Sequence, residues 1–183
     1  MSTPTLVITG PSGVGKGTLI RALLERLPEL QLAVSATTRP PRAEEMNGVD
    51  YHFLSQEDFD RRVAAGEFVE HAVYAGNSYG TLRSELERPA ACIVLEIDLQ
   101  GARQVRETLP DALSVFIEPP SFEALVERLR GRGSDTPEQI ERRLAAARDE
   151  LAAAEEFDCR VVNDQLERAV DELSALAARM YRS

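Results

Sequence analysis

A glycine-rich segment near the N-terminus has the residue types and spacing of a phosphate-binding loop. Its sequence, GPSGVGKGT, follows an apolar run at 5–9 and precedes a periodic apolar pattern that predicts a helix over 17–27. Glycines let backbone N–H groups turn toward phosphate oxygens, and the helix N-terminus adds partial positive charge. We therefore expect these residues to bind the phosphates of a nucleotide: Gly10, Pro11, Ser12, Gly13, Val14, Gly15, Lys16, Gly17 and Thr18.

This loop departs from the commonest pattern at one position. Gly17 stands directly after the lysine, where Ser or Thr is usual, and Thr18 comes one residue later. The departure weakens a direct contact between this position and Mg²⁺. We expect the ion to be held largely through water, with Thr18 and Glu96 as candidate ligands.

A second candidate site begins at the segment Arg39-Pro40-Pro41-Arg42. Two prolines favour a polyproline II path with three residues per turn, so the two arginines would project on the same side, roughly 9 Å apart. Two guanidinium groups on one stiff edge suit a phosphate group. A solvated linker or a proline-rich peptide ligand is the alternative interpretation.

Two acidic residues come at the end of the apolar run ACIVLEI (91–97). Glu96 and Asp98 alternate with Ile97, so in an extended strand they would point to the same side. The carboxyl ends of parallel strands form the ligand-binding edge of such a sheet. Taken alone, each carboxylate is more often a solvated surface charge.

Several motifs in a fixed order make the sequence similar to the guanylate kinase family. They are GPSGVGKGT, SATTRPPR, NGVDYHF, EFVEHAVYAGNSYGT, LEIDLQG, GRGSDTPEQIERRL and VVND, and they span nearly the whole chain. The phosphate loop alone is general, whereas the set is highly specific. The resemblance implies an enzyme that transfers the γ-phosphoryl group of ATP to GMP, with Mg²⁺ as the cofactor of ATP.

The resemblance also implies roles for individual residues. Arg39, Arg42, Tyr51 and Tyr79 would hold the GMP phosphate, while Ser35, Glu70, Thr81 and Asp98 would read the guanine. Glu96 would lie near the waters of Mg²⁺, at a position where the family often has Asp. Asn163 and Asp164 match the loop on the adenine side of ATP. Lys16, Arg42, Arg132 and Arg143 would be the catalytic cations.

The segment 131–153 is expected to form a mobile lid. Gly131 and Gly133 bracket Arg132 in a hinge-like placement, and Thr136 opens a helix that runs to about 153. On that helix Arg143 lies at the edge of the apolar stripe and Arg142 on the far side, so Arg143 is the better candidate to turn inward. Ordinary surface charges are the alternative for Arg132 and Arg143.

The elements that position these residues alternate between strands and helices. Strands are predicted at 5–9, 30–34, 91–97, 113–117 and 160–162, and helices at 17–27, 100–108, 121–130, 136–153 and 166–180. This order indicates an α/β protein with a parallel sheet covered on both faces, the three-layer P-loop kinase fold. We expect one domain with a core of 1–34, 82–130 and 154–183, a small α+β GMP-binding insert at 35–81 and the lid.

Composition limits the other functions. The net charge of −10 argues against nucleic acid or an anionic membrane as a partner, and no apolar run reaches membrane-spanning length. Cys92 and Cys159 are expected to be buried free thiols, which fits a cytoplasmic protein. A monomer or small homo-oligomer is expected. Two alternatives remain: a non-catalytic guanylate-kinase-like domain that binds a phosphorylated protein, and a related P-loop kinase with another small phosphorylated acceptor.

Overall fold

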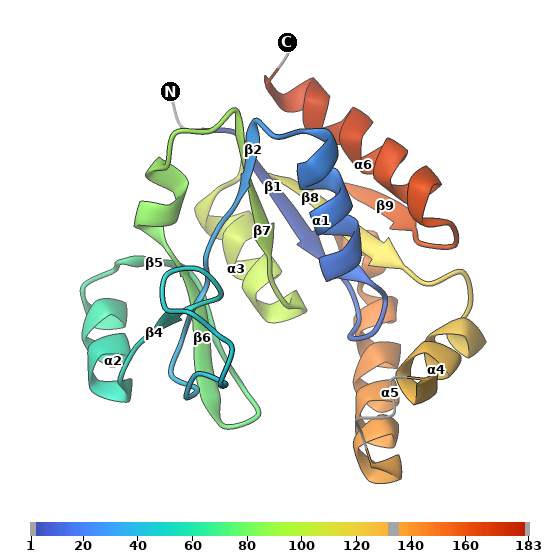
Figure 1. Ribbon diagram of the computed structural model, residues 1–183, viewed down its shortest axis with the longest axis horizontal. Coiled ribbons are helices and arrows are strands. Elements are labelled where there is room, and N and C mark those ends of the chain that lie inside the picture. The colour runs from blue at the N-terminus through green and yellow to red at the C-terminus, as the bar shows by residue number, and fades with distance from the viewer. Residues whose placement is uncertain (1–2, 132–135, 182–183) are drawn as a thin grey trace.

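The protein is built around a parallel sheet of five strands. The computed structural model describes residues 3–131 and 136–181 (Figure 1). The strands, in spatial order β2-β7-β1-β8-β9, are β2 (Leu30–Leu32), β7 (Cys92–Glu96), β1 (Thr5–Thr9), β8 (Leu113–Glu118) and β9 (Cys159–Val162). All four neighbouring pairs are parallel, which confirms the predicted fold class.

Helices cover both faces of this sheet, so the core has three layers. Leu6 and Ile8 of β1 belong to one apolar cluster, together with residues of α1 (Lys16–Arg26) and α6 (Leu166–Tyr181). Val7, which points the opposite way, belongs to a second cluster with α3 (Leu99–Thr108). Because residues of β1 pack on both faces of the sheet, the whole strand is buried, as expected for a parallel sheet.

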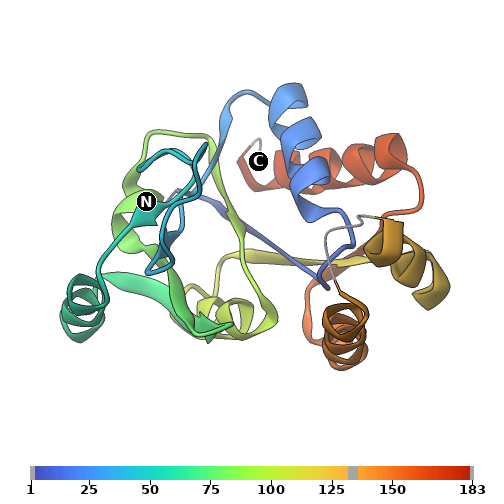
Figure 2. The same cartoon turned by 60° about the horizontal axis from the view of Figure 1, so that its bottom comes forward.

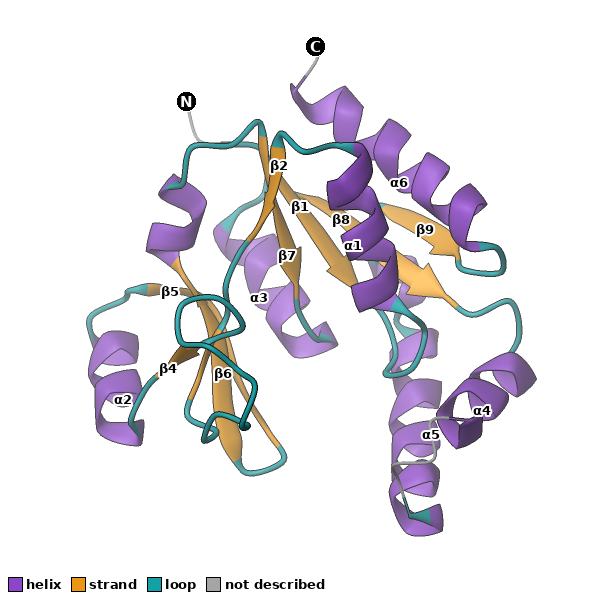
Figure 3. Cartoon of the chain, in the orientation of Figure 1, coloured by secondary structure: helices purple, strands orange, loops and turns teal. Residues whose placement is uncertain are grey.

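A second, smaller sheet lies in the segment between β2 and β7. Its spatial order is β4 (His52–Phe53), β3 (Ala36–Thr37), β6 (Asn77–Leu82) and β5 (Phe68–Tyr74). The α2 helix (Gln56–Ala64) packs on it through Phe59, and the Ser55 side chain caps the N-terminus of that helix. The chain then returns to the core through a short 3₁₀ helix, η1 (Arg83–Glu87) (Figure 3).

Two helices stand on the other side of the strand ends. These are α4 (Phe122–Gly131) and α5 (Pro137–Ala152), which lie apart from the small sheet in both views (Figures 1 and 2). Thr136 and Gln139 form a reciprocal capping box that starts α5, as the sequence predicts. Arg132 lies outside the described residues.

Three sequence predictions about local structure are wrong. The strand predicted over 30–34 ends at Leu32, since the backbone N–H of Val34 donates to the Glu85 carboxylate and leaves the sheet. The strand predicted to reach 97 ends at Glu96. Cys159 is only half-buried, although both cysteines are free thiols and Cys92 is buried. In the described part of the chain, no helix is long and apolar enough to cross a membrane.

Candidate active site

The phosphate loop occupies the turn between β1 and α1. Gly10, Gly13 and Gly15 have positive φ angles of 145°, 85° and 97°. A Cβ atom on Gly10 would lie 2.5 Å from the Ile117 carbonyl oxygen, so both conformation and space require glycine there. The Lys16 ammonium group donates to the carbonyl oxygens of Gly10 and Pro11 across the loop. The loop thus has the backbone shape of a phosphate cradle with its lysine over the opening.

Two side chains from distant elements hold this loop in place. The Asn163 amide, buried just after β9, donates to the Val14 carbonyl oxygen at 2.8 Å. Arg128 of α4 donates to the same oxygen at 3.2 Å and to the Asn163 carbonyl oxygen at 2.7 Å. The structure therefore places Asn163 beneath the loop, while Asp164 is exposed and pairs with Arg168. Sequence reasoning missed Arg128, which no spacing distinguishes from Arg130, the other arginine of α4.

The side chains expected to read a purine base meet where the small sheet touches α3. Glu70 of β5 is only 4% exposed, and its carboxylate accepts a hydrogen bond from the Thr81 hydroxyl at 2.7 Å. A Cβ atom on Gly101 would lie 2.5 Å from Glu70 Oε2 and 3.3 Å from Asp98 Oδ1. Glu70, Thr81 and Asp98 are therefore grouped around the first turn of α3.

Burial dominates the electrostatics of this group. It raises the pKa of Glu70 to about 7, although the Thr81 hydrogen bond opposes this rise, and the negative charge of Asp98 adds a smaller upward contribution. A carboxyl group poised near neutrality is characteristic of functional sites.

Asp98 does not occupy the position that strand alternation predicts. It lies beyond the end of β7, and its carboxylate caps α3 by accepting a hydrogen bond from the Gly101 N–H at 2.7 Å. The expectation that Glu96 and Asp98 share one side of a strand is therefore wrong. Asp98 nevertheless reaches the Glu70 group through its place at the helix N-terminus.

The residues expected to bind a phosphate form a neighbouring cluster in which Arg39 already has a partner. Its guanidinium group makes two hydrogen bonds to Glu45, of 2.8 and 3.0 Å, and lies 5.4 Å from the centre of the Tyr51 ring. The Tyr51 and Tyr79 rings are 6.2 Å apart. Glu45, which the sequence analysis missed, has a pKa lowered to about 2 by Arg39 and by the N–H of Arg42.

The Arg42 side chain is exposed, and its backbone N–H donates to the Glu45 carboxylate at 2.7 Å. Glu45 N–H in turn donates to the Arg42 carbonyl oxygen at 3.1 Å, which closes a turn after the two prolines. The polyproline path therefore ends in a turn organised by Glu45. Ser35 lies nearby along the chain, half-buried, and its carbonyl oxygen accepts a hydrogen bond from the His52 N–H.

Carboxylates from two elements lie in the electrostatic range of Lys16. Glu96 is half-buried at the end of β7, and its pKa is raised because burial outweighs the attraction of Lys16. Glu150 of α5 is similar: burial raises its pKa, and Lys16 and the Ser12 N–H partly offset the shift. Sequence reasoning missed Glu150, which links α5 to the phosphate loop.

Arg143 and Arg142 differ in the way the helical wheel predicts. Arg143 is half-buried on α5, whereas Arg142 is exposed. Thr18 is exposed on the first turn of α1. No cluster of three His, Cys, Asp or Glu side chains suited to a metal exists among the residues with described positions.

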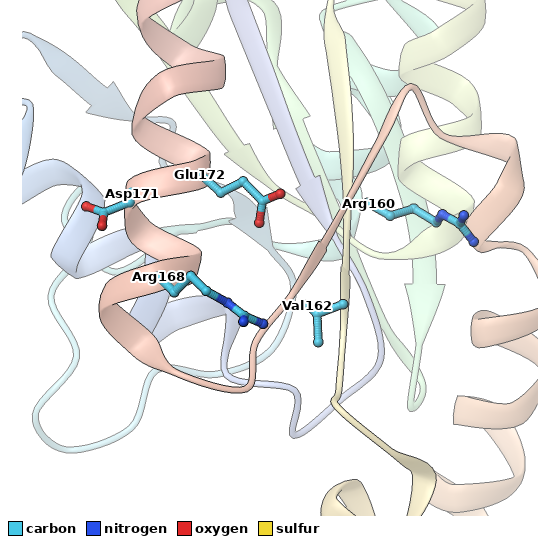
Figure 4. A pocket seen from close by; sticks show the side chains of 5 residues that line it. All are labelled: Arg160, Val162, Arg168, Asp171 and Glu172. Atoms are coloured by element: carbon cyan, nitrogen blue, oxygen red, sulfur yellow. The ribbon is translucent and has the colours of Figure 1, made fainter.

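A small open cavity lies apart from these groups, between β9 and α6 (Figure 4). Its lining consists of Arg160, Val162, Arg168, Asp171 and Glu172. No residue expected to bind a nucleotide or metal lines it, so it is not part of the candidate site.

Comparisons with known proteins agree with this geometry. The guanylate kinase family model matches residues 2–179. A guanylate kinase from Nostoc sp. is 54% identical over 173 residues, covering 93% of this chain and 87% of that protein. One from Frankia casuarinae is 57% identical over 173 residues, covering 93% and 94%.

Solved structures give the same result. A guanylate kinase from Anaplasma phagocytophilum has a TM-score of 0.77 at 32% identity, covering 100% of this chain and 88% of that one. A gluconokinase from Sinorhizobium meliloti, with a TM-score of 0.52 at 19% identity, covers 100% and 96% and is similar in fold alone. From its motifs, its sheet order and these matches, the chain belongs to the guanylate kinase family.

Proposed function

We propose that this protein transfers the γ-phosphoryl group of ATP to GMP, producing ADP and GDP in purine nucleotide metabolism, and that it also accepts dGMP, which would give dGDP. The observation that carries the proposal is the buried group of Glu70 and Thr81 beside Asp98, assembled where the small sheet meets α3. The phosphate loop supports a nucleotide as the phosphoryl donor, and the Glu70 group supports guanine as the base of the acceptor.

The chemistry of Glu70 suits guanine and disfavours adenine. Guanine presents its N1–H and 2-amino group as donors, and an ionised carboxylate only accepts hydrogen bonds. Adenine presents an acceptor at N1, which would leave the buried carboxylate without a partner. Leaving a buried polar group unpaired costs about 1–3 kcal/mol or more. A site of this kind supports discrimination of about 10²-fold or more.

The phosphate of GMP would bind at the cluster of Arg39, Arg42, Tyr51 and Tyr79. In the structure Glu45 engages the Arg39 guanidinium group. A phosphate dianion would compete with Glu45 for this arginine, since a carboxylate and a phosphate group both present a pair of oxygen acceptors that fits a guanidinium fork. The Arg39 and Glu45 pair would then act as a preformed, exchangeable anion site.

Phosphoryl transfer would depend on the alignment of the two substrates and on positively charged side chains around their phosphates. The attacking phosphate oxygen of GMP is already anionic near neutral pH, so no general base is required. Two unit charges 4 Å apart repel by about 4 kcal/mol at an effective dielectric constant of 20. Lys16, Arg42 and Arg143 would offset this repulsion and stabilise charge on the transferred group, as would Arg132, which lies outside the described residues. Closure of the lid segment would exclude water and suppress ATP hydrolysis.

On the ATP side, the loop from Gly10 to Thr18 would hold the phosphates, and Asn163 and Asp164 would lie near the adenine. The residues present fit Mg²⁺, which usually binds one or two carboxylates, substrate phosphates and water. Glu96 and Thr18 would contact its water shell. Bound with ATP, the ion would neutralise phosphate charge. Two features also support a cytoplasmic location. One is the need for both ATP and GMP, and the other is the presence of free thiols.

A coupled assay with ATP against GMP, dGMP, AMP, CMP and UMP tests this function. We expect GMP and dGMP to be phosphorylated and the other three nucleotides to react at least about 10²-fold less efficiently. Comparable rates with AMP would contradict the assignment of Glu70. No turnover with any nucleotide, together with tight binding of a phosphorylated peptide, would favour the non-catalytic alternative.

A further inference from the structure

One buried carboxylate lies where the small sheet rejoins the core. Glu85, in η1, is 7% exposed and accepts three hydrogen bonds. The donors are the Val34 N–H at 2.9 Å, His52 Nε2 at 2.8 Å and the Arg88 guanidinium group at 2.9 Å. They come from the segment that leaves the core, from β4 and from the end of η1. Glu85 therefore joins η1 to two segments that are distant from it in sequence, the one that contains Val34 and the one that contains His52.

The first two donors flank residues assigned to GMP. Val34 directly precedes Ser35, and His52 directly follows Tyr51. The two segments also bond to each other, because the His52 N–H donates to the Ser35 carbonyl oxygen at 2.9 Å. One carboxylate thus holds the backbone beside Ser35 and the side chain beside Tyr51 in the same cluster.

Glu85 contrasts with Glu70, the other buried carboxylate of this region. Burial alone would raise the pKa of Glu85, but the Val34 N–H, His52 and Arg88 outweigh it, so the pKa is lowered. Glu85 is therefore ionised at neutral pH and fully engaged by donors. Removing it would leave the Val34 N–H and the His52 ring without their acceptor in a largely buried place.

From this geometry we propose that Glu85 is a positioning residue for the GMP site. It fixes the Ser35 and Tyr51 segments relative to the core without touching the substrate. The inference rests on the proposed assignment of Ser35 and Tyr51 to GMP. Since the phosphate loop is held separately by Asn163 and Arg128, loss of Glu85 weakens GMP binding and leaves ATP binding intact.

The test compares Glu85→Ala with a matched control, Asp158→Ala. Asp158 is also a carboxylate that joins two parts of the chain, because it accepts hydrogen bonds from the Ser114 N–H at 2.8 Å and hydroxyl at 2.6 Å. It lies at the start of β9 and contacts no GMP-site residue in these hydrogen bonds. The Asp158→Ala variant therefore shows how turnover responds to the loss of a carboxylate that joins two segments elsewhere in the chain.

We expect Glu85→Ala to raise KM for GMP about ten-fold while KM for ATP stays within about two-fold. Asp158→Ala should leave KM for GMP unchanged. Glu85→Gln should partly restore GMP affinity, because its amide can accept from Val34 and donate to a neutral His52 ring. His52→Ala should raise KM for GMP on its own but add little to Glu85→Ala, since both remove the same contact.

Two results would overturn the inference. One is an equal rise in KM for GMP and ATP in Glu85→Ala, and the other is a comparable rise for GMP in Asp158→Ala. If Glu85→Ala does not fold, Glu85→Gln and His52→Ala give the same readout, and an unchanged KM for GMP in both would reject the proposal. Two further variants, Tyr51→Phe and Ser35→Ala, distinguish failure of the proposed GMP site from failure of the positioning role of Glu85. If these leave KM for GMP unchanged, the proposed GMP site itself is wrong, whereas a rise there without one in the Glu85 and His52 variants rejects only the positioning role.

Discussion

At the scale of single residues, Lys16 lies at the phosphate loop. Its ammonium group donates to the backbone carbonyl oxygens of Gly10 and Pro11, and its side chain is half-buried. We expect Lys16→Met to lower kcat by about 10²-fold or more, because a charge on the transferring phosphoryl group loses its nearest cation. Circular dichroism and the thermal midpoint should change little. Turnover at the wild-type rate would remove the phosphate role of this lysine.

Glu70 makes the binding of GMP depend on pH. Its pKa of about 7 means that the carboxyl group is partly protonated at neutral pH, and only the ionised form accepts from both donors of guanine. We expect KM for GMP to rise as the pH falls from 8 to 6, with KM for ATP following a different profile. Glu70→Gln should bind GMP weakly at both pH values. A parallel pH profile for the two substrates would contradict this role.

The same carboxyl group also makes the free energy of unfolding depend on pH. Its folded pKa, about 7, is above the ordinary value of 4.5, so the folded protein holds this proton more tightly than the unfolded chain does. The resulting stability is complete below pH 4.5 and is lost as the pH rises through 7, a change on the order of 3 kcal/mol. Urea titrations of Glu70→Gln should lack this component. A wild-type and a Glu70→Gln protein with the same pH slope would show that burial does not perturb Glu70.

At the scale of elements, α3 lies against the Glu70 carboxylate as well as against the core. Gly101 in its first turn leaves the space that Glu70 fills, 2.5 Å from where a Cβ atom would stand. We expect Gly101→Ala to displace the Glu70 carboxylate and lower kcat/KM for GMP about 10- to 100-fold with little change in KM for ATP. The measurement is steady-state kinetics with each substrate varied.

Glu107→Ala is the matched control for Gly101→Ala, since it adds no atom near Glu70 and its side chain is exposed on the same helix. If Gly101→Ala kept wild-type kinetics for GMP, Glu70 would have another resting position, and the proposed base site would need a different geometry.

The predictable and unpredictable parts of the fold differ in length and in sequence separation. Strands such as β1 and β8 and helices such as α6 are long enough for an apolar period, and the phosphate loop lies within nine consecutive residues. In contrast, β3 and β4 have two residues each, too few for any period. The contacts of Arg128 and Glu85 join residues 114 and 51 positions apart.

The candidate site also has a part that the sequence predicts and a part that it does not. Motifs predicted which residues gather, but not how they are held. The Asp98 cap, for example, depends on where β7 ends and α3 begins, and the pairing of Arg39 with Glu45 depends on a turn after the prolines. Such details arise from packing between elements, which a single sequence does not display.

Across the whole molecule, two side chains illustrate how the small sheet is connected to the core. Gln104 of α3 donates to the His71 carbonyl oxygen and accepts from the His71 N–H, as a neighbouring strand would. Glu85 makes the second connection, to the segment before β3 and to β4. GMP bound between Glu70, Ser35 and Tyr51 would contact the small sheet at both connections.

Bound GMP should therefore stabilise the whole protein in a single unfolding transition. A ligand present at 100 times its dissociation constant adds about 2.7 kcal/mol to the free energy of unfolding, which is about 5–10 °C in the thermal midpoint for a chain of this size. We expect this shift from GMP at pH 8, a smaller one at pH 6, where Glu70 is protonated, and almost none from AMP. Differential scanning calorimetry measures all three. Two separate transitions, of which GMP moves only one, would mean that the small sheet unfolds independently of the core.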